Sequence, residues 1–168
     1  MHRRKFLKQG AFGLLGIAAL PEIIISQQNK RPPALESAVV KEFVQVAHTD
    51  LEKVKVLLEQ YPLLLNASWD WGGGDFETAL GAAGHMGLPE TANYLLSKGA
   101  RADIFVLTML GKTETVKLML TDYPILLNSL GPHGFTLLHH AEKGGSEASE
   151  LKEFLLSRGL KEKHIKLY

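Results

Sequence analysis

Residues Thr78–Gly87 read TALGAAGHMG, and residues Thr136–Gly145 follow the same pattern as TLLHHAEKGG. Each stretch leads into a segment that ends in two leucines and a glycine, LLSKG at Leu95–Gly99 and LLSRG at Leu155–Gly159. A unit of this size cannot bury its apolar face by itself, so copies of it stack on one another. The repeat therefore predicts an all-α chain built as a short solenoid of helix-turn-helix units.

Two weaker units complete the expected set of four. The first spans residues 34–61, where apolar residues recur at three- and four-residue intervals and Asp50 can cap the second helix. The third spans residues 104–120 and lacks the Thr-x-Leu opening. Only 24 residues separate Gly87 from Gly111. We therefore expect the loop before the third unit to be shortened.

The repeated motif resembles the ankyrin repeat, whose units open with TPLHxAAxxG and close with LLxxGA. The resemblance covers residues 34–160 and departs from the family at Ala79, Leu137 and Gly81, while His139 keeps the family histidine. It implies an ankyrin solenoid with hairpin-like loops that binds other proteins. It also implies a structural role for the matching motif positions, which are Thr78, Leu80, Gly87, Gly99, Thr136 and His139.

The amino terminus resembles a twin-arginine export signal, because Arg3 and Arg4 open the string RRKFLK. The nearly uncharged run Gly10–Leu20 has 11 residues, whereas a membrane-spanning helix needs roughly 20. We expect residues 1–26 to be a leader, 27–33 a linker, 34–160 the repeat domain and 161–168 a basic tail. Export to the periplasm follows, and a retained leader that acts as a loose tether stays open.

Charge and cysteine content limit the possible partners. Four of the 19 basic residues and one of the 18 acidic residues lie in the expected leader, which leaves 15 basic against 17 acidic residues. A slightly acidic domain lacks the positive charge that dominates nucleic-acid binding, so we exclude that class of partner. The sequence has no cysteine, so the domain must be stable through packing without disulfides.

The segment 66–77 is the expected recognition loop, because it holds both tryptophans of the chain and three consecutive glycines. Aromatic side chains bury a large area at low entropy cost, and glycines let a partner approach the backbone. An alternative is that the rings fold back onto the helices and the glycines only turn the chain. The expected partner-binding residues are Trp69, Asp70, Trp71, Gly73 and Asp75, with His133 from the Gly131–Gly134 tip.

Histidines suggest a second possibility, because His133, His139 and His140 are close in sequence and His85 lies in the matching turn of an earlier unit. Three imidazoles can bind zinc. His139, however, occupies the ankyrin histidine position, and the resemblance implies that it bonds to a backbone carbonyl between units. We therefore expect no metal or other cofactor, and a histidine-based metal-binding protein remains an alternative.

Catalytic signatures are missing from the sequence, which has no HExxH, no GxSxG and no cysteine nucleophile. Asp70, Asp75 and His133 could serve a small hydrolase or lyase if a pocket joined them, and this alternative stays open. Our expectation is a monomeric protein–protein interaction module without catalytic activity. The identity of its protein partner does not follow from the sequence.

Overall fold

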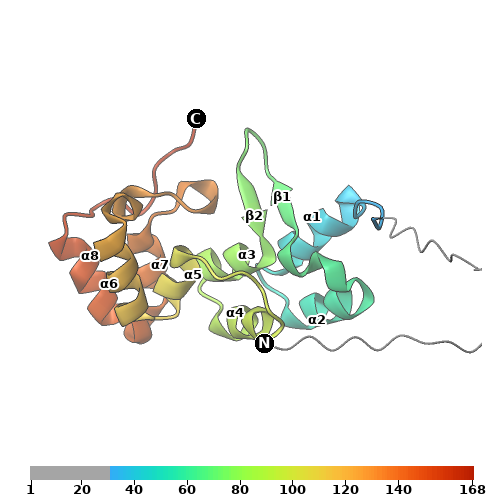
Figure 1. Cartoon of the computed structure of the whole chain (residues 1–168), viewed down its shortest axis with the longest axis horizontal. Helices are drawn as coiled ribbons and strands as arrows, with labels where there is room; N and C mark the ends of the chain where they lie inside the picture. The colour runs from blue at the N-terminus through green and yellow to red at the C-terminus, as the bar shows by residue number, and fades with distance from the viewer. Residues whose placement is uncertain (1–30) are drawn as a thin grey trace, which may run out of the picture. The chain divides into compact units, whose positions relative to one another are not determined.

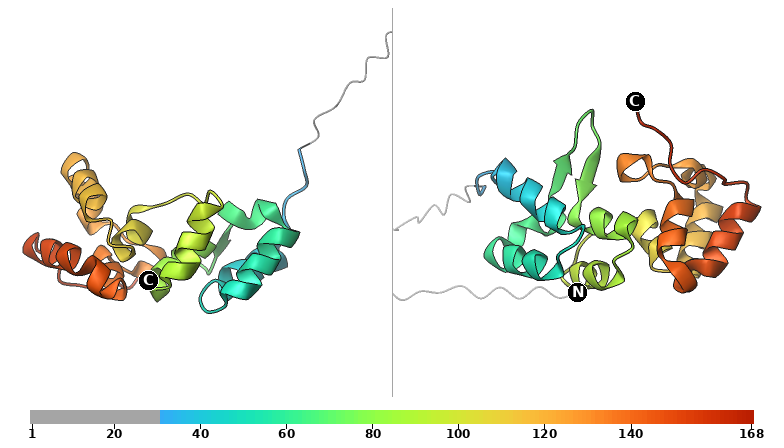
Figure 2. Two further views of the ribbon diagram at one scale, coloured as in Figure 1. Left: turned by 90° about the horizontal axis from the view of Figure 1, so that it is seen from below. Right: turned by 180° about the vertical axis from the view of Figure 1, so that it is seen from behind.

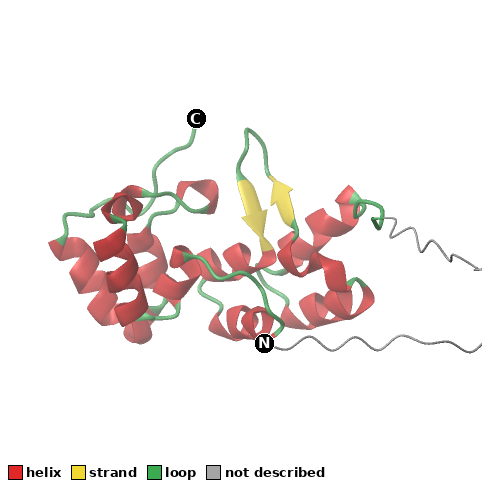
Figure 3. Ribbon diagram, in the orientation of Figure 1, coloured by secondary structure: helices red, strands yellow, loops and turns green. Residues whose placement is uncertain are grey.

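The computed structural model describes residues 31–168, of which Ala34–Tyr168 form one compact unit. The predicted leader, with Arg3 and Arg4, lies outside the described residues. The described chain is mostly helical and contains one small two-stranded sheet (Figures 1 and 3). The predicted all-α class is confirmed at this coarse level.

The helices follow one another in pairs along residues 34–168. Their bounds are α1 (Ser37–Val46), α2 (Leu51–Gln60), α3 (Ala79–Met86), α4 (Pro89–Ser97), α5 (Ile104–Met109), α6 (Thr113–Asp122), α7 (Leu137–Lys143) and α8 (Ser149–Ser157). The two helices of each pair pack together, and α1, α3, α5 and α7 also pack in that order against one another. Short 3₁₀ turns lie at Pro62–Asn66, Pro124–Asn128, Pro132–Gly134 and Gly145–Ala148.

Local signals in the sequence account for the helix ends. The Asp50 side chain accepts a hydrogen bond from the Lys53 amide at 3.0 Å, and Thr78 Oγ1 accepts one from the Gly81 amide at 3.0 Å. These bonds satisfy amides that have no partner within the helix. Gly87 ends α3 in the left-handed region at φ 76°. A glycine is required there because L-residues with a side chain rarely adopt that conformation.

Two apolar clusters hold the helices together. The first joins α1 to α5 around Phe43, Leu80 and Leu95, and the second joins α5 to α8 around Leu137 and Leu155. Helix α5 contributes to both clusters. Every helix pair therefore depends on its neighbours to bury its apolar side chains.

A hairpin finger, defined here as residues 68–78, stands out from the helices on one side. Its strands β1 (Ser68–Asp70) and β2 (Phe76–Thr78) pair antiparallel, with Trp69 opposite Glu77. The finger and the end of the chain project on the same side of the helices in Figure 1 and in the right-hand view of Figure 2. The third unit has no such hairpin, as its short sequence predicted.

The last residues of the chain run back along the fourth unit. Phe135 and His164 form an antiparallel bridge, and the Thr136 amide donates to the Lys163 carbonyl at 3.0 Å. The segment that the sequence suggested as a tail is thus paired to the repeat region. Within residues 31–168, we find no helix with the length and hydropathy required to cross a bilayer.

We expect buried His140 to make the protein less stable in mild acid. Burial lowers the pKa of His140 to about 4, against the opposing effect of the Thr136 carbonyl that accepts its Nδ1–H at 2.8 Å. Between pH 6.5 and 4 the unfolded chain therefore binds a proton that the folded chain refuses, so stability falls as pH falls. From about pH 7 to about pH 5 this residue costs about 2 kcal/mol. Urea unfolding of chelator-treated protein should show that loss, and His140→Gln should lack it. Equal pH dependence in both proteins would contradict this expectation.

Candidate metal centre

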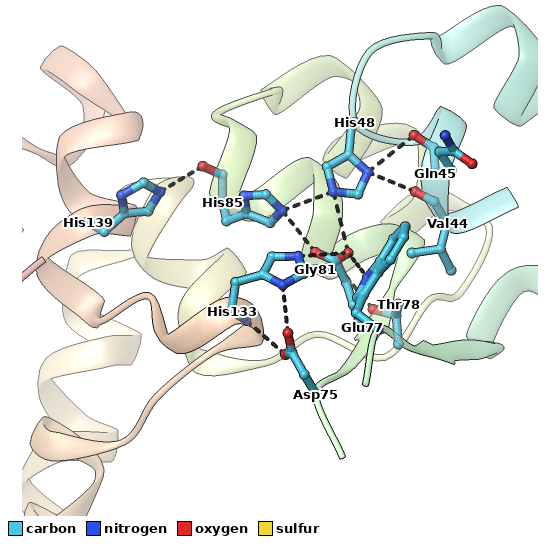
Figure 4. Close-up of polar contacts among 11 residues, drawn as sticks. Val44, Gln45, His48, Asp75, Glu77, Thr78, Gly81, His85, His133 and His139 are labelled. Carbon is cyan, nitrogen blue, oxygen red and sulfur yellow. Dashed lines mark hydrogen bonds and ion pairs between the residues drawn. The ribbon is translucent and has the colours of Figure 1, made fainter. Parts of the chain in front are cut away.

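Three imidazoles and one carboxylate converge at the base of the finger. They belong to His48, Glu77, His85 and His133, and one ligand atom from each lies within 4.8 Å of all the others. Figure 4 shows the three rings arranged around the Glu77 carboxylate. The four residues are spread over 86 positions of the sequence, so folding alone brings them together.

Different elements supply each group. His48 lies in the turn that follows α1, Glu77 is on β2, His85 is in the last turn of α3, and His133 is in the 3₁₀ turn Pro132–Gly134. Alternation along β2 leaves Phe76 exposed and turns Glu77 inward, because successive strand residues point to opposite faces. The side chains of Glu77 and His85 are 0% and 7% exposed, whereas those of His48 and His133 are 20% and 29% exposed.

The Nε2 atom of every imidazole faces the carboxylate. His48 Nε2 and His133 Nε2 each lie 3.4 Å from Glu77 Oε2, and His85 Nε2 lies 2.9 Å from Oε1. His48 Nε2 and His85 Nε2 are 3.2 Å apart. Ligands bound at 2.0–2.1 Å to a tetrahedral zinc ion are separated by about 3.4 Å. The separations of His85 Nε2 from His48 Nε2 and from Glu77 Oε1 are therefore near the length of an edge of such a coordination polyhedron.

The opposite ring nitrogens fix the tautomers of two of the histidines. His48 Nδ1 lies 3.0 Å from the Val44 carbonyl, and His133 Nδ1 lies 2.7 Å from Asp75 Oδ2. Both partners are acceptors, so each Nδ1 carries a proton and each ring directs its Nε2 at the Glu77 carboxylate. The same arrangement orients histidines that bind metals, with the far nitrogen held by a carbonyl or a carboxylate.

Glu77 is the anion at the centre of the cluster. Its Oε2 accepts the Trp71 Nε1–H at 2.7 Å, while its Oε1 is buried and accepts no hydrogen bond from any described residue. Burial alone would raise the pKa of Glu77, but the imidazoles of His48 and His85 outweigh it and lower the pKa to about 2. The same carboxylate raises the pKa of His48. The nearest group to Oε1 is His85 Nε2 at 2.9 Å, and a buried carboxylate is stabilised by a donor or a positive charge at this position.

His133 is held in a strained backbone conformation. It has φ 59°, and it is the one described residue other than glycine with a positive φ. This geometry costs about 1 kcal/mol or more for a residue with a side chain. Asp75 offsets the strain, because its carboxylate accepts both the His133 amide at 2.8 Å and Nδ1–H at 2.7 Å. A turn that needed only a positive φ would use glycine, so the imidazole itself is required.

The residues predicted to bind a partner divide into two groups. Trp71, Asp75 and His133 point into the cluster or support it, as described above. Trp69 packs partly buried against the first apolar cluster, beneath the Lys41 ammonium. Asp70 shapes the tip by accepting the Gly72 amide at 2.9 Å, and Gly73 is exposed there. Both tryptophan rings thus pack onto the helices, which is the alternative considered for this loop from the sequence.

The histidines weighed from the sequence also divide. His85 and His133 are in the cluster, whereas His139 Nε2 donates to the His85 carbonyl at 2.8 Å and His140 to the Thr136 carbonyl. Burial lowers the pKa of His139. The expectation of no metal site did not weigh His48 and Glu77, which the fold brings beside His85 and His133. The alternation of apolar and polar residues along β2 is the sequence signal that could have predicted an inward-pointing Glu77.

The geometry does not place the three residues of the hydrolase alternative, Asp70, Asp75 and His133, in one shared site. Both oxygens of Asp75 are taken by His133, and Asp70 bonds to glycine amides at the finger tip. Comparison of the chain with family models and with curated proteins gave no match. The site must therefore be interpreted from its own chemistry.

Replacing Trp71 with phenylalanine should destabilise the metal-free protein. The change removes the N–H that bonds to buried Glu77 Oε2 while it keeps an aromatic ring. Loss of one hydrogen bond to a charged group costs about 1.5–3 kcal/mol. Trp69→Phe is the matched control, because no hydrogen bond from the Trp69 indole is seen in the described structure. Urea unfolding in the presence of a chelator measures both variants, and equal losses would contradict the assigned role of Trp71.

Proposed function

We propose that this protein binds a divalent transition-metal ion of the Zn²⁺ type through His48, Glu77, His85 and His133. One observation carries the proposal, which is the gathering of three imidazoles and a carboxylate so that one ligand atom of each lies within 4.8 Å of the others. Deprotonated groups held this close repel one another unless a cation lies between them. A metal ion satisfies all four at once.

Protons alone satisfy the cluster less well. A proton on His48 Nε2 can serve one neighbour at a time, and a proton on His85 Nε2 is shared between His48 Nε2 at 3.2 Å and Glu77 Oε1 at 2.9 Å. His48 Nε2 and His133 Nε2 also face the same carboxylate oxygen at 3.4 Å. A cation at the centre removes both problems, because metal–ligand attraction acts on every donor simultaneously.

The donor set favours particular ions. Three imidazole nitrogens with one carboxylate oxygen suit Zn²⁺, Cu²⁺, Ni²⁺ or Fe²⁺, whereas Mg²⁺ and Ca²⁺ require oxygen ligands. Trp71 occupies Glu77 Oε2 and leaves Oε1 as the available donor, so the carboxylate would bind through one oxygen. Four protein ligands are typical of closed structural or storage sites, while catalytic zinc sites keep one position free. We therefore propose metal binding without catalysis.

The purified full-length protein should bind one Zn²⁺ per chain. Glu77→Gln and His85→Ala should each weaken zinc binding by more than about 100-fold, because each removes a direct ligand and the first also removes the negative charge. Glu90→Gln is the control, since Glu90 is exposed at the start of α4 and lies outside the cluster. Isothermal titration calorimetry and elemental analysis measure affinity and stoichiometry. Absence of zinc binding by the unmodified protein would overturn the proposal.

Protein binding is a second candidate function, and an exposed apolar pattern favours it. Exposed apolar residues on the outer helices and turns recur at a spacing of 62 residues. The three pairs are Val56 with Leu118, Tyr61 with Tyr123 and Leu63 with Ile125. Leu63 and Ile125 are 64% and 77% exposed. Exposed apolar side chains in a repeated arrangement mark contact surfaces. We propose on this basis, and on the ankyrin-like motifs, an exported monomeric repeat protein whose outer surface contacts another protein.

The double variant Leu63→Ser/Ile125→Ser should lose its protein contacts while it keeps its fold. The measurement is in vivo crosslinking in the cell compartment where the protein resides, followed by identification of the adduct. Glu59→Ser/Asp122→Ser, which changes exposed charged residues near the ends of α2 and α6, just before the two 3₁₀ turns, is the matched control. Crosslinking that persists in the Leu63/Ile125 variant would contradict a role of these two residues in partner contact. Zinc content should be the same in all three proteins.

A further inference from the structure

The loop that holds His133 is also the platform for the end of the chain. The Ile165 amide donates to the Gly134 carbonyl at 2.9 Å, and the Thr136 amide donates to the Lys163 carbonyl at 3.0 Å. Thr136 Oγ1 adds a bond to the Glu162 carbonyl at 2.7 Å. We call residues 162–168 the C-terminal strap. Its pairing begins one residue after His133, so the position of the loop determines where the strap can dock.

Little else holds the strap in place. Residues 161–168 are all exposed, and Leu160 is the last buried residue of the chain. The Lys163 ammonium lies 2.8 Å from a Glu142 carboxylate oxygen, but exposed ion pairs contribute little. Segments that combine few buried contacts with exposed backbone hydrogen bonds open at low free-energy cost. Docking of the strap is therefore sensitive to small changes in the loop.

The strap forms one wall of a groove that adjoins the proposed metal centre. The groove has a volume of about 480 Å³, and its lining includes Tyr168 and Leu167 from the strap with Phe76 from the finger. Asp75 and Pro132 line it as well. Asp75 therefore belongs both to the groove and to the support of the proposed metal centre, because its carboxylate also orients His133. The Tyr168 ring reaches the finger tip, where a Cβ added at Gly73 would lie 3.3 Å from it.

We propose that metal occupancy at the cluster controls docking of the C-terminal strap and thereby the width of this groove, an inference that rests on the proposed metal binding. A metal bond to His133 Nε2 would add to the two bonds from Asp75 and offset the strain of φ 59°. The loop would then be fixed in the geometry that aligns the Gly134 carbonyl with the Ile165 amide. Without the ion the loop keeps fewer restraints, and the strap exchanges between docked and free states.

Hydrogen exchange of the full-length protein tests the coupling directly. Exchange is followed by mass spectrometry or NMR at the Ile165 and Thr136 amides, with Zn²⁺ or with a chelator. Removal of zinc should reduce protection at these two amides by about 5-fold or more, while amides of α4 stay unchanged. His133→Ala should show the low protection in both conditions.

Linkage supplies an independent test. If zinc favours the docked strap, the docked strap must favour zinc by the same factor. Ile165→Pro removes the amide that bonds to Gly134 and should weaken zinc binding several-fold. Lys166→Pro is the control, because the Lys166 amide makes no backbone bond among the described residues.

The two proposals fail in different ways. Zinc binding with unchanged strap protection would overturn the coupling and leave metal binding intact. Absence of zinc binding would overturn both. Equal zinc affinities of the Ile165→Pro and Lys166→Pro variants would also contradict the coupling, even if both proteins fold normally by circular dichroism.

Discussion

The buried carboxylate of Glu77 is the constraint on which the rest of the site depends. A carboxylate removed from water costs several kcal/mol unless charge and hydrogen bonds compensate it. Here the Trp71 N–H and the imidazoles of His48 and His85 favour the ionised carboxylate, so the pKa of Glu77 falls to about 2 despite its burial. The base of the finger is thereby tied to α3 and to the turn that follows α1.

The turn Pro132–Gly134 meets the finger although the two are far apart in sequence. Residues 98–103 form a short connection from α4 to α5, whereas the finger precedes α3. Helix α3 contacts both α7 and the Pro132–Gly134 turn. These contacts bring His133 to Asp75 over 58 positions of sequence.

Local features were predictable from the sequence because they depend on neighbouring residues. The Asp50 and Thr78 caps, the left-handed Gly87 and the missing third hairpin all follow from short-range rules. The cluster did not follow, since its members are separated by 29 or more positions except for Glu77 and His85. Spacing within one segment grouped His133 with His139 and His140, and the last two bond to backbone carbonyls. Sites assembled by stacking cannot be recognised from spacing in a single unit.

His139 links helix packing to the cluster. Its Nε2 lies 2.8 Å from the carbonyl of His85, so a side chain of α7 restrains the backbone at the end of α3. The Phe135 ring stacks on His139 with centroids 4.0 Å apart and on His85 at 5.2 Å. These contacts restrain the His85 ring, whose Nε2 lies 2.9 Å from Glu77 Oε1. The same side chain thus contributes to the packing of α7 on α3 and to the position of one member of the cluster.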